Sequence, residues 1–234
     1  MKLQTVLQKN FYPFNIYALH GFLGNSSHWD SFRLPLKAID IFDIPENSMN
    51  AWARAFNQRI TTTNNILLGY SMGGRLSLHA LINNPKQWKA AILVSTHPGL
   101  QMEKRERLEK DAIWLKRFSE EDFESVIQDW NQQPIFSTST FVPKHYSKEK
   151  LVKSLHHWSL GNQEDLREAI SRLKVPILWI VGARDQKYVD LSKTITLSHP
   201  QSKIWIAANA AHRVPWEVKK EFETEVNIFL KGVL

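Results

Sequence analysis

The sequence predicts an α/β domain with a mainly parallel β-sheet and helices on both of its faces. Short apolar runs bounded by turn residues alternate along the chain with segments of helical length. These runs are apolar throughout rather than at every second position, which is typical of strands covered on both faces. The chain has 234 residues, 43% of them hydrophobic. That is enough for one domain with its own core.

Six apolar runs are the expected strands, and four longer segments between them are the expected helices. The strands are predicted at residues 16–19, 38–42, 65–68, 90–95, 176–181 and 203–207. The helices are predicted at 49–61, 74–83, 187–198 and 215–230, and Ser48 is a suitable N-cap for the first of them. Strands that alternate with helices in this way favour three layers, with the sheet in the middle.

Residues 100–165 interrupt this alternation, because they contain no strand-like run. Helical segments are expected at about 101–118, 119–132 and 147–158. We interpret the segment as a helical lid over the carboxyl edge of the sheet, where open α/β sheets bind ligands. The predicted organisation is one catalytic domain, with residues 1–99 and 166–234 as the two parts of its core.

Composition and charge exclude several classes of function. The net charge of +7 is spread along the chain, with 9 basic and 4 acidic groups in residues 1–99, 10 and 10 in 100–153, and 11 and 9 in 154–234. No basic stripe results, so no nucleic-acid partner is expected, whereas a pocket for a small anionic metabolite is possible. No run approaches the ~18 apolar residues of a membrane span, and no signal-peptide core is present. We therefore expect a cytoplasmic protein.

No cofactor is expected either. The chain has no cysteine, so disulfides and thiolate metal sites are excluded. It also has no G-x-G-x-x-G motif and no histidine–carboxylate cluster at the spacing of metal ligands.

A G-x-S-x-G motif follows the third expected strand and precedes a helix. Its residues are Gly69-Tyr70-Ser71-Met72-Gly73. In this context a sharp turn holds the serine above the sheet, and the glycines allow neighbouring backbone to pass close by. The helix N-terminus beside the serine favours negative charge. Ser71 is thus the candidate nucleophile or base.

A second turn is positioned to support negative charge beside Ser71. The segment His20-Gly21-Phe22 follows the first long strand. Such a turn can direct the backbone N–H of Phe22 to the space above Ser71, where with the N–H of Met72 it would form an oxyanion hole. His20 itself is interpreted as a structural loop residue.

Ser71 requires a base, and His212 is the best placed of the nine histidines. His212 lies between the last expected strand and the last helix, and Asp185 follows the fifth strand. A buried carboxylate there would orient the imidazole and stabilise its cation. Asp190 is the substitute candidate for this role, although it falls inside the next expected helix.

The order serine, aspartate, histidine resembles the α/β-hydrolase superfamily over essentially the whole chain. Within it, three segments resemble the 2-succinyl-6-hydroxy-2,4-cyclohexadiene-1-carboxylate synthases of menaquinone biosynthesis. They are Gly-Tyr-Ser-Met-Gly-Gly-Arg at 69–75, His-Pro-Gly-Leu-Gln at 97–101, and Asp-Trp-Asn-Gln-Gln-Pro-Ile-Phe at 129–136. The second and third are the more specific.

The resemblance implies a lyase that eliminates pyruvate, with the serine, histidine and aspartate acting together as the base. It also implies arginines that bind the carboxylates of the substrate. Arg75 matches one of them and Arg107 is the best match to another, while Tyr70 and Trp130 match pocket positions. A trianionic substrate requires planar guanidinium groups in a water-poor site, which agrees with Arg75.

The sequence departs from the family pattern at two places in the expected lid. A third lid arginine is expected beyond Phe136, but no arginine follows there until Arg167. Lys144 is the candidate replacement, although an ammonium group is not a bidentate fork. Residue 131 is Asn131, where the family pattern suggests an aromatic side chain.

Two other functions remain open from the sequence. The first is a serine carboxylester or thioester hydrolase, including one that acts on acyl-carrier-protein esters through an acyl-enzyme. Carboxylate-binding arginines inside the pocket would favour the synthase, and an apolar tunnel would favour the hydrolase. The second is a catalytically silent binding module, which the ordered Ser71, Asp185 and His212 disfavour.

Overall fold

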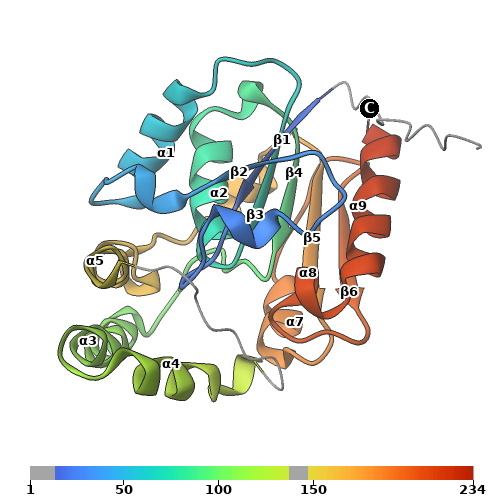
Figure 1. Cartoon of the computed structure of the whole chain (residues 1–234). Coiled ribbons are helices and arrows are strands. Elements are labelled where there is room, and N and C mark those ends of the chain that lie inside the picture. Colours follow the sequence, from blue (N-terminus) through green and yellow to red (C-terminus); the bar gives the residue numbers. More distant parts are fainter. Residues whose placement is uncertain (1–13, 137–146, 234) are drawn as a thin grey trace, which may run out of the picture.

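The computed structural model describes residues 14–136 and 147–233, which form a single parallel six-stranded sheet with helices around it (Figure 1). The strands lie in the order β2-β1-β3-β4-β5-β6, and every neighbouring pair is parallel. Their bounds are β1 (Asn15–Leu19), β2 (Leu36–Ile39), β3 (Asn65–Tyr70), β4 (Trp88–Val94), β5 (Ile177–Gly182) and β6 (Lys203–Ala207). The predicted α/β class is confirmed.

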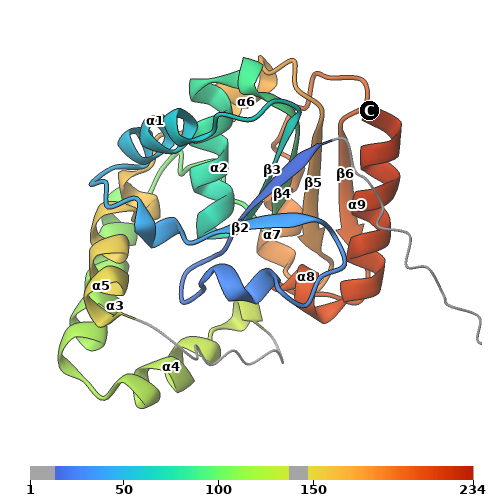
Figure 2. The same cartoon turned by 45° about the horizontal axis from the view of Figure 1, so that its top comes forward.

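Helices cover both faces of the sheet (Figure 2). One face carries α1 (Met49–Arg59), α2 (Met72–Asn83) and α6 (Arg167–Ser171). The other face carries α9 (Lys219–Val233), which follows the short α8 (Val214–Glu217). In the described part of the chain, no helix combines the length and the apolar character needed to cross a bilayer.

Both faces of the central strands are buried, which explains their uninterrupted apolar sequence. In β3, Leu67 packs into the core beneath α1 and α2, whereas Ile66 and Leu68 pack into the core beneath α9. All three side chains are fully buried. Successive residues of a strand point to opposite faces, so a strand between two helical layers needs apolar residues at every position.

Several element boundaries differ from the sequence prediction, most clearly at the second strand and in the last two helical segments. The strand predicted at 38–42 lies at Leu36–Ile39, because the Asp40 carboxylate accepts the Phe42 N–H at 2.9 Å and starts a 3₁₀ turn. The helix predicted at 187–198 is α7 and ends at Ser192. The final helix is divided between Glu217 and Lys219, so α8 and α9 are separate.

Three of the helices between β4 and β5 pack together near the carboxyl end of the sheet (Figures 1 and 2). They are α3 (Lys104–Glu120), α4 (Phe123–Asn131) and α5 (Lys148–His157). Their shared apolar cluster is separate from the two cores of the sheet and consists of Leu23, Phe118, Val126, Ile127, Leu151 and Leu155. Only Leu23 in this cluster belongs to the segment before β4.

Candidate active site

Ser71 lies at the turn between β3 and α2 in a strained backbone conformation. Its φ of 52° and ψ of −112° lie outside the regions that non-glycine residues normally adopt. A Cβ atom on Gly69 would overlap the Ser77 Oγ, and one on Gly73 would overlap the carbonyl oxygen of His20. The two glycines of the motif are therefore needed for close passage of the chain on both sides of Ser71.

Ser71, His212 and Asp185 form a continuous hydrogen-bonded chain. The Ser71 Oγ lies 3.1 Å from His212 Nε2, and His212 Nδ1 lies 2.7 Å from Asp185 Oδ2. His212 is 2% exposed and Asp185 is 3% exposed. The carboxylate can only accept, so Nδ1 of a neutral imidazole carries the proton and Nε2 is left to accept from Ser71.

The loops that carry Asp185 and His212 are tied to each other through their backbones. The N–H of Ala183 donates to the carbonyl of Ala207, and the N–H of Arg184 donates to that of Ala210, each at 2.9 Å. Asp185 also caps α7 through its carboxylate, and the carbonyl of His212 accepts the Ser95 hydroxyl at 2.7 Å. The substitute candidate Asp190 instead forms an exposed ion pair with Lys193.

The loop after β1 passes directly beside the serine. A Cβ atom on Gly21 would lie 2.8 Å from the Tyr70 ring and 3.3 Å from the Ser71 Cβ. Gly21 and Phe22 both line the cavity beside Ser71. The N–H of Met72, the first residue of α2, belongs to the first helical turn and has no acceptor within the helix.

His20 holds this loop rather than facing the serine. Its side chain is fully buried. Nδ1 lies 2.8 Å from the carbonyl oxygen of Gly21, and Nε2 lies 3.1 Å from the backbone nitrogen of Ile41 and 3.2 Å from Asp40 Oδ1. These contacts are what a structural loop histidine makes.

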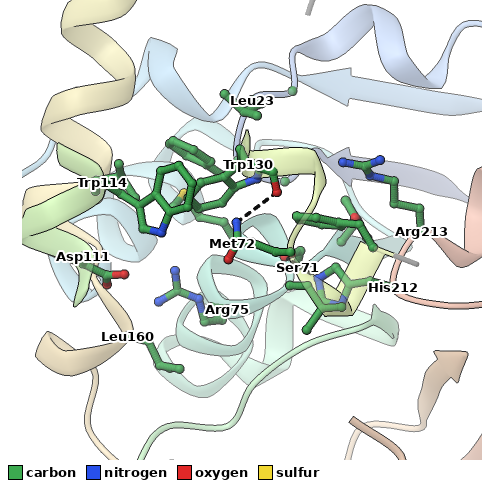
Figure 3. A pocket seen from close by; sticks show the side chains of 18 of the residues that line it. Leu23, Ser71, Met72, Arg75, Asp111, Trp114, Trp130, Leu160, His212 and Arg213 are labelled. Atoms are coloured by element: carbon green, nitrogen blue, oxygen red, sulfur yellow. Dashed lines mark hydrogen bonds between the residues drawn. The ribbon is translucent and has the colours of Figure 1, made fainter. Parts of the chain in front are cut away.

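A cavity of about 780 Å³ opens above Ser71, between the carboxyl ends of the strands and the inserted helices (Figure 3). Its lining includes these residues singled out in the sequence: Phe22, Tyr70, Ser71, Met72, Arg75, Arg107, Trp130 and His212. Asp185 lies behind His212. Lys144, the proposed replacement for a third arginine, lies outside the described residues.

Arg75 extends from α2, one turn after Ser71, into this cavity. The residue is only 7% exposed. Its Nη1 donates to Gln163 Oε1 at 3.2 Å and contacts the Met49 sulfur at 3.8 Å, so these partners are uncharged. Burial, followed by repulsion from Arg107, lowers the pKa of Arg75 to about 10. Arg75 is therefore a buried cation of the pocket and not a solvent-facing helix residue.

Arg107 reaches the same cavity from α3 and is held by Asp111. The Arg107 Nε donates to Asp111 Oδ1 at 2.8 Å, and Asp111 Oδ2 accepts the Ser159 hydroxyl at 2.6 Å. Asp111 is 6% exposed, whereas the side chain of Arg107 remains 33% exposed. Arg107 therefore lies at the rim, with part of its guanidinium open to the cavity.

Three further residues line the cavity that the sequence did not single out, although each follows a motif residue closely. Lys187 and Tyr188 come two and three positions after Asp185, and Arg213 follows His212 directly. The Tyr188 ring lies 4.7 Å from the imidazole of His212, and burial raises the pKa of Tyr188 to about 12. The sequence signal that could have found these three residues is their position within three residues of Asp185 or His212.

The described lining of the cavity is positively charged on balance. Five cationic side chains contribute to it, against two carboxylates. The cations are Arg75, Arg107, Lys110, Lys187 and Arg213, and the carboxylates are Asp111 and Glu217. The remaining wall is largely aromatic, with Trp114, Trp130, Phe136, Trp158 and Trp216 among its members. Such a cavity suits an organic anion with an apolar body. No group of three or more metal-ligating side chains occurs in the described ranges.

Comparison with known proteins gives consistent matches. A family model named Hydrolase_4 and described as serine aminopeptidase, S33, matches residues 40–214. A Salmonella agona protein named 2-succinyl-6-hydroxy-2,4-cyclohexadiene-1-carboxylate synthase is 30% identical over 201 residues, which cover 76% of this chain and 80% of the relative. A Haemophilus influenzae protein has the same name with a provisional status. It is 30% identical over 207 residues, which cover 76% of this chain and 84% of that relative.

A solved structure described as MenH from S. aureus also matches. It superimposes with a TM-score of 0.85 at 25% sequence identity, and the match covers 94% of each chain. The similarity therefore extends over the core and the inserted helices together.

Proposed function

The chain belongs to the α/β-hydrolase family and, within it, to the 2-succinyl-6-hydroxy-2,4-cyclohexadiene-1-carboxylate synthases, and from this premise we propose that it is a lyase of menaquinone biosynthesis. Its reaction would eliminate pyruvate from a succinyl-enolpyruvyl-hydroxycyclohexene carboxylate. The observation that carries the proposal is the buried guanidinium of Arg75, one helical turn from Ser71. An esterase for neutral substrates has no use for a buried cation at this position.

The first step is removal of a proton next to the succinyl ketone. The Ser71 Oγ takes this proton as its own hydroxyl proton passes to His212 Nε2, 3.1 Å away. The Asp185 carboxylate, 2.7 Å from Nδ1, stabilises the imidazolium that results. The electron pair of the broken C–H bond moves onto the ketone oxygen, which becomes an enolate.

The enolate collapses through the ring and breaks the C–O bond to the enolpyruvyl group, which leaves as pyruvate once it is protonated. We assign the backbone N–H groups of Phe22 and Met72 as the donors that stabilise the enolate oxygen. The N-terminus of α2 contributes to the same effect, because its dipole favours negative charge beside Ser71. The proton on His212 is available to the leaving group.

The remaining pocket residues bind and orient the substrate. Arg75, from α2, and Arg107, from α3, are proposed to bind carboxylates. Tyr70 and Trp130 form apolar walls, and the Trp130 ring packs 4.8 Å from that of Phe22. We further propose that the helices in 100–165 serve as a lid over one catalytic domain made of 1–99 and 166–234.

The aromatic wall of the cavity keeps one other function open. Trp114, Trp130 and Phe136 would equally suit the acyl chain of an ester. In a carboxylester or thioester hydrolase, Ser71 would attack the carbonyl and form an acyl-enzyme instead of removing a proton. The cationic groups of the lining are the reason to prefer the lyase.

A coupled assay of pyruvate release tests the proposal. The enolpyruvyl precursor, freshly made by the preceding enzyme of the pathway, is given to wild-type protein and to Ser71→Ala, Arg75→Ala and Arg105→Ala. Arg105 is an exposed arginine of α3 and serves as the matched control. Release well above the spontaneous rate is expected, with collapse in Ser71→Ala and Arg75→Ala only.

Short-chain p-nitrophenyl esters provide the counter-substrate. Ester turnover that requires Ser71 but not Arg75, without pyruvate release, would move the protein to the hydrolases. Failure of a fluorophosphonate probe to label Ser71, together with no turnover of either substrate, would instead indicate a binding protein.

A further inference from the structure

Arg213 places a second buried guanidinium in the cavity, away from Arg75. The residue directly follows His212 and is 7% exposed, the same fraction as Arg75. In the view of Figure 3, Arg75 and Arg213 lie on opposite sides of Ser71. Both line the cavity, so one ligand above the serine can reach both.

Uncharged groups from three elements hold the Arg213 guanidinium. Its Nη2 donates to Asn131 Oδ1 at 2.6 Å, and its Cζ lies 4.2 Å from the centre of the Phe136 ring. The Tyr70 hydroxyl lies near enough to favour the charged form of Arg213. These contacts fix the orientation of the planar group, because an amide, a ring face and a phenol each constrain it differently.

Burial and a neighbouring carboxylate act in opposite directions on the charge of Arg213. Burial is the largest influence and lowers its pKa, while the nearby Glu217 carboxylate acts in the opposite direction. Glu217 Oε2 is itself the acceptor of the Ala211 N–H, and Glu217 also lines the cavity. A buried cation in this setting is stabilised further when an anion binds beside it.

The two cationic regions are built independently. Arg75 lies within electrostatic reach of Arg107 and Asp111, whereas Arg213 lies within reach of Tyr70 and Glu217. One region depends on α2 and α3, and the other on the loop after β6 together with the end of α4. A ligand with two separated carboxylates would match this arrangement better than a monoanion would.

The contact between Arg213 and Asn131 also joins two departures of the sequence. The stretch beyond Phe136 lacks an arginine until Arg167, and Arg167 is bound to Asp165 and the carbonyl of Gly99. The aromatic side chain expected at position 131 is an asparagine, which accepts from Arg213. Asn131 therefore positions a guanidinium group of the cavity wall.

We propose that Arg213 forms a second carboxylate-binding subsite, which binds one carboxylate of the substrate while Arg75 binds another, with Asn131 and Phe136 as positioning residues. This inference rests on the proposed function for the identity of the substrate, but its chemistry requires only a dicarboxylate with an apolar body. It makes Arg213 a specificity-determining residue.

Binding of stable probes to the Ser71→Ala protein tests the subsite without turnover. The probes are 2-succinylbenzoate, which has a ring and a chain carboxylate, 4-oxo-4-phenylbutanoate, which lacks the ring carboxylate, and 2-butanoylbenzoate, which lacks the chain carboxylate. Dissociation constants are measured by calorimetry in the Ser71→Ala background, alone and with Arg213→Met, Arg213→Lys, Arg75→Met or Arg184→Met. Arg184 is an exposed neighbour of Asp185 and is the matched control.

Arg213→Met is expected to weaken the dianion about 10- to 100-fold, since a charge-assisted hydrogen bond is lost. Arg213→Met should leave the dissociation constant of one single-carboxylate probe unchanged. Arg75→Met should leave the dissociation constant of the other single-carboxylate probe unchanged. The affinity of Arg213→Lys for the dianion is expected to lie between those of the parent protein and Arg213→Met, because lysine keeps the charge but not the planar bidentate group. Arg184→Met should change nothing.

Asn131→Leu tests positioning. It should weaken the same probes as Arg213→Met but by a smaller factor, and the thermal midpoint of each variant shows whether the fold is intact. The proposal is overturned if Arg213→Met weakens all three probes equally, if it weakens none, or if the parent protein binds none of them. Probe discrimination without pyruvate release by the wild-type enzyme would instead refute the proposed function and leave the subsite standing.

Discussion

The two walls of the active-site cavity are built in different ways. On the core side, Ser71, Asp185 and His212 are positioned by backbone: a strained turn, a helix cap and hydrogen bonds between loops. On the side of the inserted helices, Arg107 and Trp130 are positioned by other side chains, namely Asp111 and a group of packed rings.

The extent of burial follows the same division. The strands β3 and β5 are buried along their whole length. The 17-residue α3 buries only Asp111 and Phe118, and its surface carries ion pairs such as Arg105–Glu109 and Lys110–Glu106. Exposed pairs of this kind contribute little to stability. The difference teaches that the triad and the buried arginines Arg75 and Arg213 belong to the well-buried side, whereas Arg107 and Trp130 belong to the side with fewer buried contacts.

The largest expected effect is the loss of activity in Asp185→Asn, on the core side of the cavity. Asparagine can still cap α7, so the fold should be retained. Its amide cannot hold His212 in the tautomer that accepts from Ser71, and kcat should fall about 10³- to 10⁴-fold. Steady-state pyruvate release measures the loss, and circular dichroism checks the fold. A loss of less than tenfold would contradict the assigned role of Asp185.

The second prediction compares one buried aromatic residue of the sheet core with one from the cluster of the inserted helices. Trp52, in α1, and Phe118, in α3, are both fully buried. Trp52→Ala should lower the free energy of unfolding by about 3–5 kcal/mol. Phe118→Ala should lower it less, because the inserted helices can open locally.

Urea unfolding and amide hydrogen exchange measure this comparison. In Phe118→Ala, faster exchange should be confined to α3 and α4, and the KM of the substrate should rise. Equal losses of global stability in both variants, without local exchange, would mean that the inserted helices unfold only together with the core.

The third prediction concerns the stability of the fold at acidic pH, which should depend on His79, a buried residue of the core. Burial lowers the pKa of His79 to about 4 from its ordinary value of 6.5. The unfolded chain therefore binds more protons than the folded chain between these two values, and stability falls as the pH is lowered through 6.5 towards 4. The loss attributable to His79 is about 3 kcal/mol at the acid end.

His79→Gln should flatten the acid limb of a plot of stability against pH from 7 to 4. His156→Gln is the matched control, since His156 is an exposed residue of α5 and its replacement should leave the limb unchanged. An unchanged acid limb in His79→Gln would show that the buried imidazole does not govern acid sensitivity.

The smallest expected effect concerns substrate binding at alkaline pH. Burial is the main cause that lowers the pKa of Arg75 below its ordinary value. A guanidinium keeps its charge over most of the measurable pH range, so the KM should rise by only about twofold, and only towards the alkaline end. Measurement of KM from pH 8 to 11 detects this change, and Arg75→Met should have a high KM without the same rise. An identical alkaline rise in Arg75→Met would assign it to another group.

The fold could be predicted from the sequence because its main signals are local. Uninterrupted apolar runs such as 65–68 are required by helices on both faces, and a glycine-flanked serine is required by the close passage of the chain. The second strand was misplaced because the apolar run continues into a turn that Asp40 caps. Apolar pattern alone does not distinguish a strand from the turn that follows it.

The substrate-binding residues could be predicted only in part. Arg75 was found because its place one turn after Ser71 is fixed by the helix. Arg213 was not, because its role depends on a contact with Asn131, 82 residues away in the sequence. Lys144 stays a prediction, since it lies outside the described residues. Long-range contacts between side chains leave no periodic pattern in a sequence.

The backbone links between the loops after β5 and β6 have a mechanical consequence. Because Ala183 and Arg184 are bonded to Ala207 and Ala210, the loop that carries the carboxylate and the loop that carries the imidazole support each other. These bonds favour the 2.7 Å distance between Asp185 and His212. The proton-transfer pair is therefore assembled before a ligand binds, and no turnover has to begin with a search for that geometry.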